Sequence, residues 1–247
     1  MNARSVDIPK QDGASAGAGR ALVPAVGGAM ALSSDQLDAR RIIRHDMDDP
    51  GTADAFRDLR TQLLARSLGG STTVLVTPVA HGRGGSFVAL NLAAAMAFDD
   101  RRAVVLVDCN LRRPCLHQRL GVAQFPGLVE FLEGSVDEIG EVTHVTGIPR
   151  LYLIPAGDRR EASGDLLGSS RMIALMDSLH GANDAVSVVL DATAVSAAPD
   201  ARILSRLTEQ SILVSAYGRD TAQAVQEASR SLDAERLAGV IFNRVPG

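Results

Sequence analysis

The chain has 247 residues and a formal net charge of −4, and 46% of its residues are hydrophobic although only 3% are aromatic. A core of this composition consists mainly of Ala, Val, Leu and Ile, which suits parallel strands buried between helices. There is no basic run and no stretch of about 18 apolar residues, so we expect neither a nucleic-acid partner nor a membrane span. Cys109 and Cys115 have neither the spacing nor the neighbours of a redox or metal pair, and we expect reduced thiols.

The first fifty residues differ in composition from the rest of the chain. Residues 1–50 are rich in Ala, Gly and Ser and lack periodicity, which predicts a disordered leader, and residues 51–247 form the predicted single domain. The domain opens on a helix that Thr52 caps and that ends by Gly69-Gly70. Apolar residues recur at helical spacing in this helix, namely Ala55, Phe56, Leu59, Leu63 and Leu64.

Strands and helices alternate along the rest of the chain, with short loops between them. This order predicts an α/β fold with a doubly wound, mostly parallel sheet. The predicted strands are Thr73–Thr77, Ala103–Asp108, Leu151–Ile154, Val186–Asp191, Ser211–Ala216 and Leu237–Asn243. The predicted helices are Ser86–Phe98, Pro114–Leu120, Gly127–Glu133, a segment that ends near His180, Pro199–Leu207 and Thr221–Leu232.

A glycine-rich loop from Val79 to Ser86 joins the first of these strands to its helix. The pattern is typical of a phosphate-binding P-loop, in which backbone N–H groups and the helix N-terminus hold an anion. Such a loop has a lysine before its serine, which neutralises the β- and γ-phosphates, but Gly85 stands there. The only lysine of the chain is Lys10. A plain strand-to-helix turn is the alternative, whereas a dinucleotide fingerprint would need glycine in place of Phe87.

Two more strands end in acidic residues, Asp108 and Asp191. Ligands of open α/β sheets bind beyond the carboxyl ends of the strands, and P-loop proteins hold Mg²⁺ there between aspartates and the loop serine. We therefore predict a P-loop NTPase-like fold with Ser86, Asp108 and Asp191 as candidate Mg²⁺ ligands. Arg83 and Arg112 are candidate replacements for the lysine, although a guanidinium differs from an ammonium in reach and shape.

Several motifs resemble the bacterial tyrosine kinases of exopolysaccharide synthesis, most of all the exosortase-associated autokinase type. The likeness extends from about Thr52 to Arg244 and rests on the order of the motifs. It implies the fold of the Min/Par-type ATPases. The segments that carry it are residues 54–64, the glycine loop, 91–93, 106–114, 151–157, 166–175 and 239–244.

The resemblance also implies roles for individual residues. Asp108 falls in the second acidic motif of these kinases and Asp191 in the Walker B position, and both would be catalytic in an active enzyme. Asp54, Arg57 and Arg60 match the helix through which family members pack into rings, and a solvated helix face with an i,i+3 ion pair is an equal alternative. The resemblance assigns Gly82, Gly84 and Ser86 to the phosphate loop and Asn243 to a contact with the nucleotide base. With Arg83, Gly85, Phe87 and Arg112 these residues make up the predicted nucleotide and phosphate contacts.

The chain departs from the family pattern at the residues that handle charge. Gly85 replaces the loop lysine, Ala80 stands where Min/Par-type loops have an extra lysine, and Asn110 replaces a second aspartate. No tyrosine-rich tail is present in the sequence, whose only tyrosines are Tyr152 and Tyr217. The loss of one charge contact to a transition state typically lowers the rate by about two orders of magnitude. We therefore expect impaired phosphoryl transfer.

The resemblance implies a cytoplasmic, kinase-like regulator of exopolysaccharide biosynthesis that binds ATP and Mg²⁺ weakly if it has kept a nucleotide site. Its implied partner is a membrane polysaccharide co-polymerase, which would bring it to the inner membrane, and self-association is a further expectation. An active tyrosine autokinase that uses another cation is one alternative. A positioning ATPase of the Min/Par type is the other.

Overall fold

The computed structural model describes residues 31–47, 51–67, 72–181 and 186–245. In this part of the chain seven strands form one sheet in the order β3-β4-β2-β5-β1-β6-β7. Only β3 is antiparallel, to its neighbour β4 at one edge, which confirms the predicted doubly wound, mostly parallel sheet. The strands are β1 (Thr73–Pro78), β2 (Ala103–Asp108), β3 (His144–Val145), β4 (Leu151–Ile154), β5 (Val186–Asp191), β6 (Gln210–Ala216) and β7 (Leu237–Asn243).

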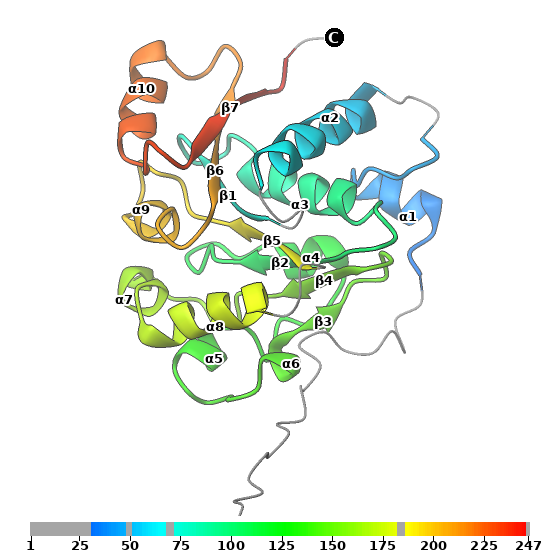
Figure 1. Cartoon of the computed structure of the whole chain (residues 1–247), viewed down its shortest axis with the longest axis vertical. Helices are drawn as coiled ribbons and strands as arrows, with labels where there is room; N and C mark the ends of the chain where they lie inside the picture. The colour runs from blue at the N-terminus through cyan, green and yellow to red at the C-terminus, as the bar shows by residue number, and fades with distance from the viewer. Residues whose placement is uncertain (1–30, 48–50, 68–71, 182–185, 246–247) are drawn as a thin grey trace, which may run out of the picture.

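Helices cover both faces of the sheet, as Figure 1 shows. Val74 and Val76 of β1 pack into one hydrophobic cluster and Leu75 into the other, because successive side chains of a strand point to opposite faces. The first cluster includes α2 (Gly51–Arg66), α3 (Gly85–Met96) and α4 (Leu116–Leu120). The second includes α5 (Leu128–Leu132), α6 (Ile139–Val142), α7 (Ser163–Leu167), α8 (Ser170–Gly181), α9 (Asp200–Leu204) and α10 (Ala222–Arg230).

Most predicted elements lie within a few residues of the observed ones. The two-residue strand β3 and the short helix α6 were not expected, because segments of this length have too few residues for a periodic pattern. In α2, Thr52 lies inside the helix, and Ala53 is buried where Ala55 was expected, since Ala55 is exposed.

A segment that the sequence placed in the disordered leader packs on the domain instead. Residues 31–47 contain helix α1 (Ser34–Ala39), which begins with a capping box between Ser33 and Gln36. Ile42 and Ile43 are 1% and 3% exposed and contribute to the core beside α3. The described part of the domain therefore begins before residue 51, whereas residues 1–30 and 48–50 of the expected leader lie outside the described residues.

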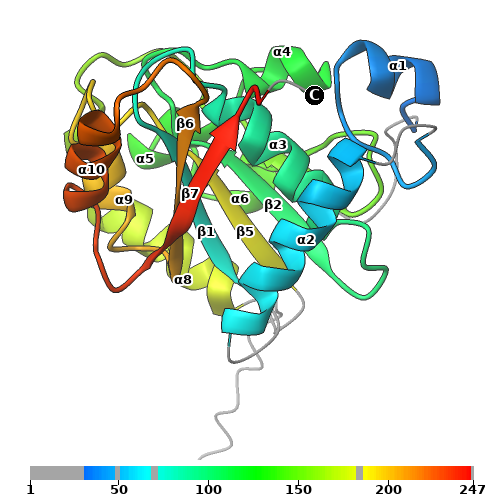
Figure 2. The same cartoon turned by 90° about the horizontal axis from the view of Figure 1, so that it is seen from above.

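A buried asparagine of α3 attaches this segment to the domain. Asn91 is fully buried; its side-chain oxygen accepts the N–H of Ile43 (2.8 Å) and its amide donates to the carbonyl of Arg41 (3.1 Å). Residues 41–43 therefore lie against the helix that follows the glycine loop. In Figure 2, α2 and α3 lie in front of the central strands.

No helix within the described residues combines the length and apolar character needed to cross a membrane.

Candidate nucleotide site

The glycine loop leads from the end of β1 into α3, as the sequence predicts. Gly82 and Gly84 have φ angles of +77° and +92°, which favour glycine because other residues are strained there. The first turn of α3 begins directly after Gly84, and the N–H of Val88 donates to the Gly84 carbonyl (3.0 Å). The free N–H groups of this helix start face the loop, an arrangement that suits an anion.

The ring of Pro78 lies close to the point where a side chain at position 85 would begin. A Cβ atom on Gly85 would lie 2.7 Å from Cδ and 3.0 Å from Cγ of Pro78. The backbone of Gly85 is helical, so its φ angle would permit any residue. Pro78 is therefore the obstacle, and a lysine at position 85 needs a change at Pro78 as well.

Two residues that were predicted to contact phosphate or nucleotide, Arg83 and Asn243, bind other residues of the protein instead. Arg83 forms an ion pair with Asp220 (Nε–Oδ1 2.7 Å), and Asp220 is nearly buried. This partner holds the guanidinium, so Arg83 is not the free loop cation that the sequence suggested. Asn243, at the end of β7, donates from Nδ2 to the Arg83 carbonyl (2.9 Å) and packs on the Cα of Gly84. Asn243 therefore supports the loop and also lines the cavity described below.

Asp108 and Asp191 lie side by side at the ends of β2 and β5, where they are register partners. The Asp108 carboxylate is fully buried and accepts three backbone N–H groups, those of Asn110 (3.2 Å), Cys115 (3.1 Å) and Leu116 (3.1 Å). Burial raises the Asp108 pKa to about 6, although these bonds oppose the shift. Asp108 thus fixes the start of α4, and its oxygens are engaged.

Asp191 has the opposite environment. It is 1% exposed, and neither of its carboxylate oxygens has a hydrogen-bond partner. Burial, and next the charge of Asp108, raise its pKa well above the usual carboxyl value, whereas the nearby Ser86 and Arg119 lower it. A buried carboxylate without a partner is costly, so this arrangement suits a site that a cation or ligand completes.

The carboxylates fit a divalent cation only in part. Asp191 with the Ser86 hydroxyl nearby offers free oxygen ligands, which Mg²⁺ prefers, but the oxygens of Asp108 are bound to the backbone. Asn110, in the place of a second aspartate, accepts a hydrogen bond from Thr193 (3.0 Å). In the part of the chain that the structure describes, no three His, Cys, Asp or Glu side chains are grouped as for a metal. Mg²⁺ would therefore need ligand oxygens from phosphates and water.

A cavity of about 1190 Å³ opens beside the glycine loop. Residues 192–194 after β5, the start of α4, Asn243 and the segment around Ile42 form its walls. Positive side chains predominate on these walls. The charged lining residues are Arg41, Arg44, Arg112, Arg113, Arg119, Arg159, Arg244, Asp38 and Glu161. The site is therefore suited to an anionic ligand.

The predicted contacts Gly82, Gly84, Gly85, Ser86, Phe87, Arg112 and Asn243 all line this cavity. Arg112 has a distant ion pair with Glu161 (3.8 Å), and its buried Nε lacks a partner. Sequence reasoning missed Arg41 and Arg44, because they lie in the segment expected to be disordered. It also missed Arg119, which no motif singled out.

No protein-family model matches the chain. Among curated proteins it is 34% identical over 218 residues to the putative tyrosine-protein kinase EpsB of Ralstonia solanacearum, covering 85% of this chain and 28% of EpsB. It is 30% identical over 225 residues to the succinoglycan biosynthesis transport protein ExoP of Rhizobium meliloti, covering 85% of this chain and 27% of ExoP. The chain thus spans about a quarter of the length of these relatives.

Solved structures decide the family. The BceF tyrosine kinase domain matches with a TM-score of 0.72 and 30% identity, over 89% of this chain and 93% of that domain. The chain belongs to the bacterial tyrosine kinases of exopolysaccharide synthesis. Its fold is accordingly that of a P-loop NTPase, as the strand, loop and helix order predicts.

The helix that resembles the ring-forming helix of these kinases is α2, and its charged residues have partners within the chain. Arg57 forms an ion pair with Asp54 (2.6 Å) and donates to the His45 carbonyl (2.9 Å). Arg60 donates to the carbonyl of Ala95 near the end of α3 (3.1 Å). These contacts join α2 to its neighbours, and a role for Asp54, Arg57 and Arg60 in self-association stays a prediction.

Proposed function

We propose that this kinase domain acts in exopolysaccharide biosynthesis and is impaired in phosphoryl transfer, with weak binding of ATP and Mg²⁺. Membership of the family and the relative named for succinoglycan biosynthesis support the pathway. The contact between Pro78 and Gly85 carries the proposal of impairment. Gly85 has no ammonium, and Pro78 crowds the Cβ position from which a lysine side chain would start, so the charge on a transferred phosphoryl group lacks its usual partner.

The remaining residues retain part of the expected chemistry. The backbone N–H groups at the start of α3 would hold phosphate oxygens, and Asn243 keeps the loop in place. Asp191 and Ser86 would hold the magnesium ion, which when bound supplies positive charge at the phosphates. Backbone N–H groups and one bound cation are enough to hold a nucleotide in the site. They do not stabilise the transition state of phosphoryl transfer efficiently.

Restoring the lysine tests this proposal, provided that Pro78 is changed too. We expect ADP formation by the unmodified protein to be close to background, and Gly85→Lys alone to gain little because the new side chain meets the proline ring. The double variant Pro78→Ala/Gly85→Lys should gain about 100-fold in turnover. Pro78→Ala alone is the matched control. Rapid ATP turnover by the unmodified protein, free of contaminating enzymes, would contradict the proposal.

The arginines around the cavity favour a second candidate, an active tyrosine autokinase that uses a guanidinium. Its acceptor would be Tyr217, which is 56% exposed, because Tyr152 lies in β4 and is 5% exposed. Under this candidate, incubation with ATP yields phosphotyrosine at Tyr217 by mass spectrometry, and Tyr217→Phe removes it. The main proposal expects no such modification.

We also propose that the domain works through a membrane polysaccharide co-polymerase, on the cytoplasmic side of the inner membrane, and that it self-associates. The family to which the chain belongs supports this placement. Ala80 stands at the extra lysine of Min/Par-type loops, so the loop gives no support to a positioning ATPase. Co-purification with the co-polymerase, and light scattering of Arg60→Ala against the unmodified protein, test the two parts separately.

A further inference from the structure

The charge that the glycine loop lacks has a candidate source on a neighbouring helix. Arg119 lies on α4, lines the cavity together with Gly84, Gly85 and Ser86, and is partly buried. Its guanidinium lies 6.0 Å from the ring centroid of Phe87, the residue next to Ser86. Arg119 thus reaches the first turn of α3, where phosphates bind in P-loop proteins.

Hydrogen bonds to Asp108 hold the helix that carries Arg119 in place. Asp108 accepts the N–H groups of Cys115 and Leu116, which holds the start of α4 at the end of β2. Cys115 lies one turn before Arg119 and lines the same cavity. The helix therefore holds Arg119 beside the glycine loop.

The other positive side chains of the cavity are engaged or exposed. Arg44 pairs with Asp38 and Asp46, Arg159 and Arg112 with Glu161, and Arg113 contacts His81. Arg41 and Arg244 are exposed. Arg119, by contrast, forms no ion pair with any acidic side chain among the described residues. Arg119 is thus a partly buried arginine of the cavity without an ion-pair partner, and its charge is near enough to Asp191 to lower the pKa of that carboxyl.

We infer that Arg119 takes over the role of the missing loop lysine, so that the cavity binds the di- or triphosphate of a nucleotide through a guanidinium on α4. This inference rests on the proposed nucleotide site and adds the residue that binds its phosphates. A guanidinium donates two parallel hydrogen bonds to phosphate oxygens and can hold an anion tightly. Its attachment to a different helix gives it another angle of approach, which is consistent with binding without efficient transfer.

The test is calorimetric binding of Mg–ADP and inorganic pyrophosphate, with adenosine as the ligand that has no phosphate. Arg119→Met keeps the stem over Phe87 and removes the charge, and we expect it to weaken ADP and pyrophosphate binding at least about tenfold. Arg119→Lys should retain most of the binding. Arg159→Gln is the matched control, because it removes one charge from the same cavity at a paired residue, and it should change affinity less than about twofold.

A second-site variant makes the test specific for the lysine's role. If Arg119 replaces that lysine, Pro78→Ala/Gly85→Lys should restore the pyrophosphate binding that Arg119→Met removes. Thermal melting checks that each variant is folded, and Arg119→Gln serves if the Met variant is not. Unchanged binding in both charge-removing variants overturns the inference, as does an equal loss in Arg159→Gln or the absence of phosphate binding by the unmodified protein. Rapid ATP turnover would refute impairment but leave Arg119 to be judged on binding alone.

Discussion

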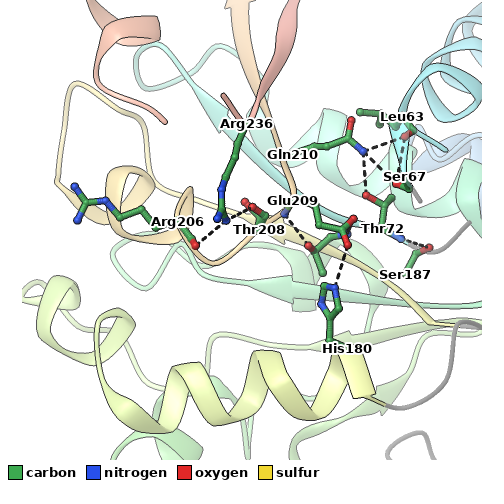
Figure 3. A network of polar contacts seen from close by, with 11 residues as sticks. Leu63, Ser67, Thr72, His180, Ser187, Arg206, Thr208, Glu209, Gln210 and Arg236 are labelled. Carbon is green, nitrogen blue, oxygen red and sulfur yellow. Dashed lines mark hydrogen bonds and ion pairs between the residues drawn. The ribbon is translucent and has the colours of Figure 1, made fainter. Parts of the chain in front are cut away.

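Polar side chains at the amino ends and at the carboxyl ends of the strands, here called the amino edge and the carboxyl edge of the sheet, differ in whether they have hydrogen-bond partners. At the amino ends of the strands, polar groups bond to one another, as Figure 3 shows. Gln210 at the start of β6 donates from Nε2 to the Leu63 carbonyl (2.9 Å), Thr72 Oγ1 (3.0 Å) and Ser67 Oγ (3.3 Å). These bonds fasten the end of α2 to β1 and β6, although Oε1 of Gln210 has no partner.

The same edge continues through Glu209 to α8. The Glu209 N–H donates to Thr73 Oγ1 (2.9 Å), and its carboxylate lies 3.0 Å from Nε2 of His180 (Figure 3). At the carboxyl edge, by contrast, Asp191 has two free buried oxygens beside a large cavity. The amino edge therefore stabilises the fold, whereas the unpartnered carboxylate at the carboxyl edge lowers stability next to the proposed site.

The largest effect is expected at the amino edge. Gln210→Ala removes a buried side chain whose two amide hydrogens are shared among three acceptors, and should lower the free energy of unfolding by about 3 kcal/mol. Nucleotide affinity should not change, because the site lies at the other end of the strands. Urea unfolding measures the stability and ADP titration the affinity. A loss of affinity in the folded variant would contradict the idea that the amino edge serves stability alone.

Asp191→Asn should raise the free energy of unfolding, whereas Gln210→Ala lowers it. Removing a buried charge without a partner should stabilise the protein by about 2 kcal/mol at neutral pH while weakening the binding of Mg–ADP. Because the folded-state pKa of Asp191 is raised, its ionisation destabilises the fold as pH rises through that value. The melting-temperature difference between variant and unmodified protein should therefore be large at high pH and vanish below about pH 4, the unfolded pKa. A destabilised variant at pH 8 would show that Asp191 has a structural partner.

A smaller loss is expected at the glycine loop. Gly84→Ala combines a φ angle of +92° with a contact between the new Cβ and the Asn243 amide. We expect a loss of about 1.5 kcal/mol in stability and weaker nucleotide binding, because the loop shifts. Gly218→Ala has a similar φ angle of +68° with open space around it, so it measures the backbone strain alone. Equal binding by the two variants would argue against a role of the Asn243 contact.

The smallest effect belongs to His180. The contact with Glu209 joins side chains that are 50% and 41% exposed, and exposed ion pairs are worth little. His180→Ala should change the free energy of unfolding by less than about 0.5 kcal/mol, measured by urea unfolding. A loss well above that value would show that this contact supports the amino edge.

Local patterns in the sequence determine much of this protein. Apolar runs, glycines and strand-end aspartates predict the parallel sheet, the loop and the neighbouring positions of Asp108 and Asp191, because the carboxyl ends of parallel strands meet at one edge. The absence of a lysine before Ser86 is likewise visible from the sequence. These features depend on residues close together in the chain or on the periodicity of an element.

Only the tertiary structure decides which side chains meet. It brings the ring of Pro78 close to Gly85 and pairs Arg83 with Asp220. It leaves the Asp191 oxygens without hydrogen-bond partners, whereas those of Asp108 accept backbone N–H groups. It also packs Ile42 and Ile43 on the core through Asn91, although their surroundings in the sequence predict disorder. The physical reason is that burial and hydrogen bonding at these positions depend on residues far apart in the chain, 137 positions in the bond between Arg83 and Asp220, and such contacts leave no periodic signal.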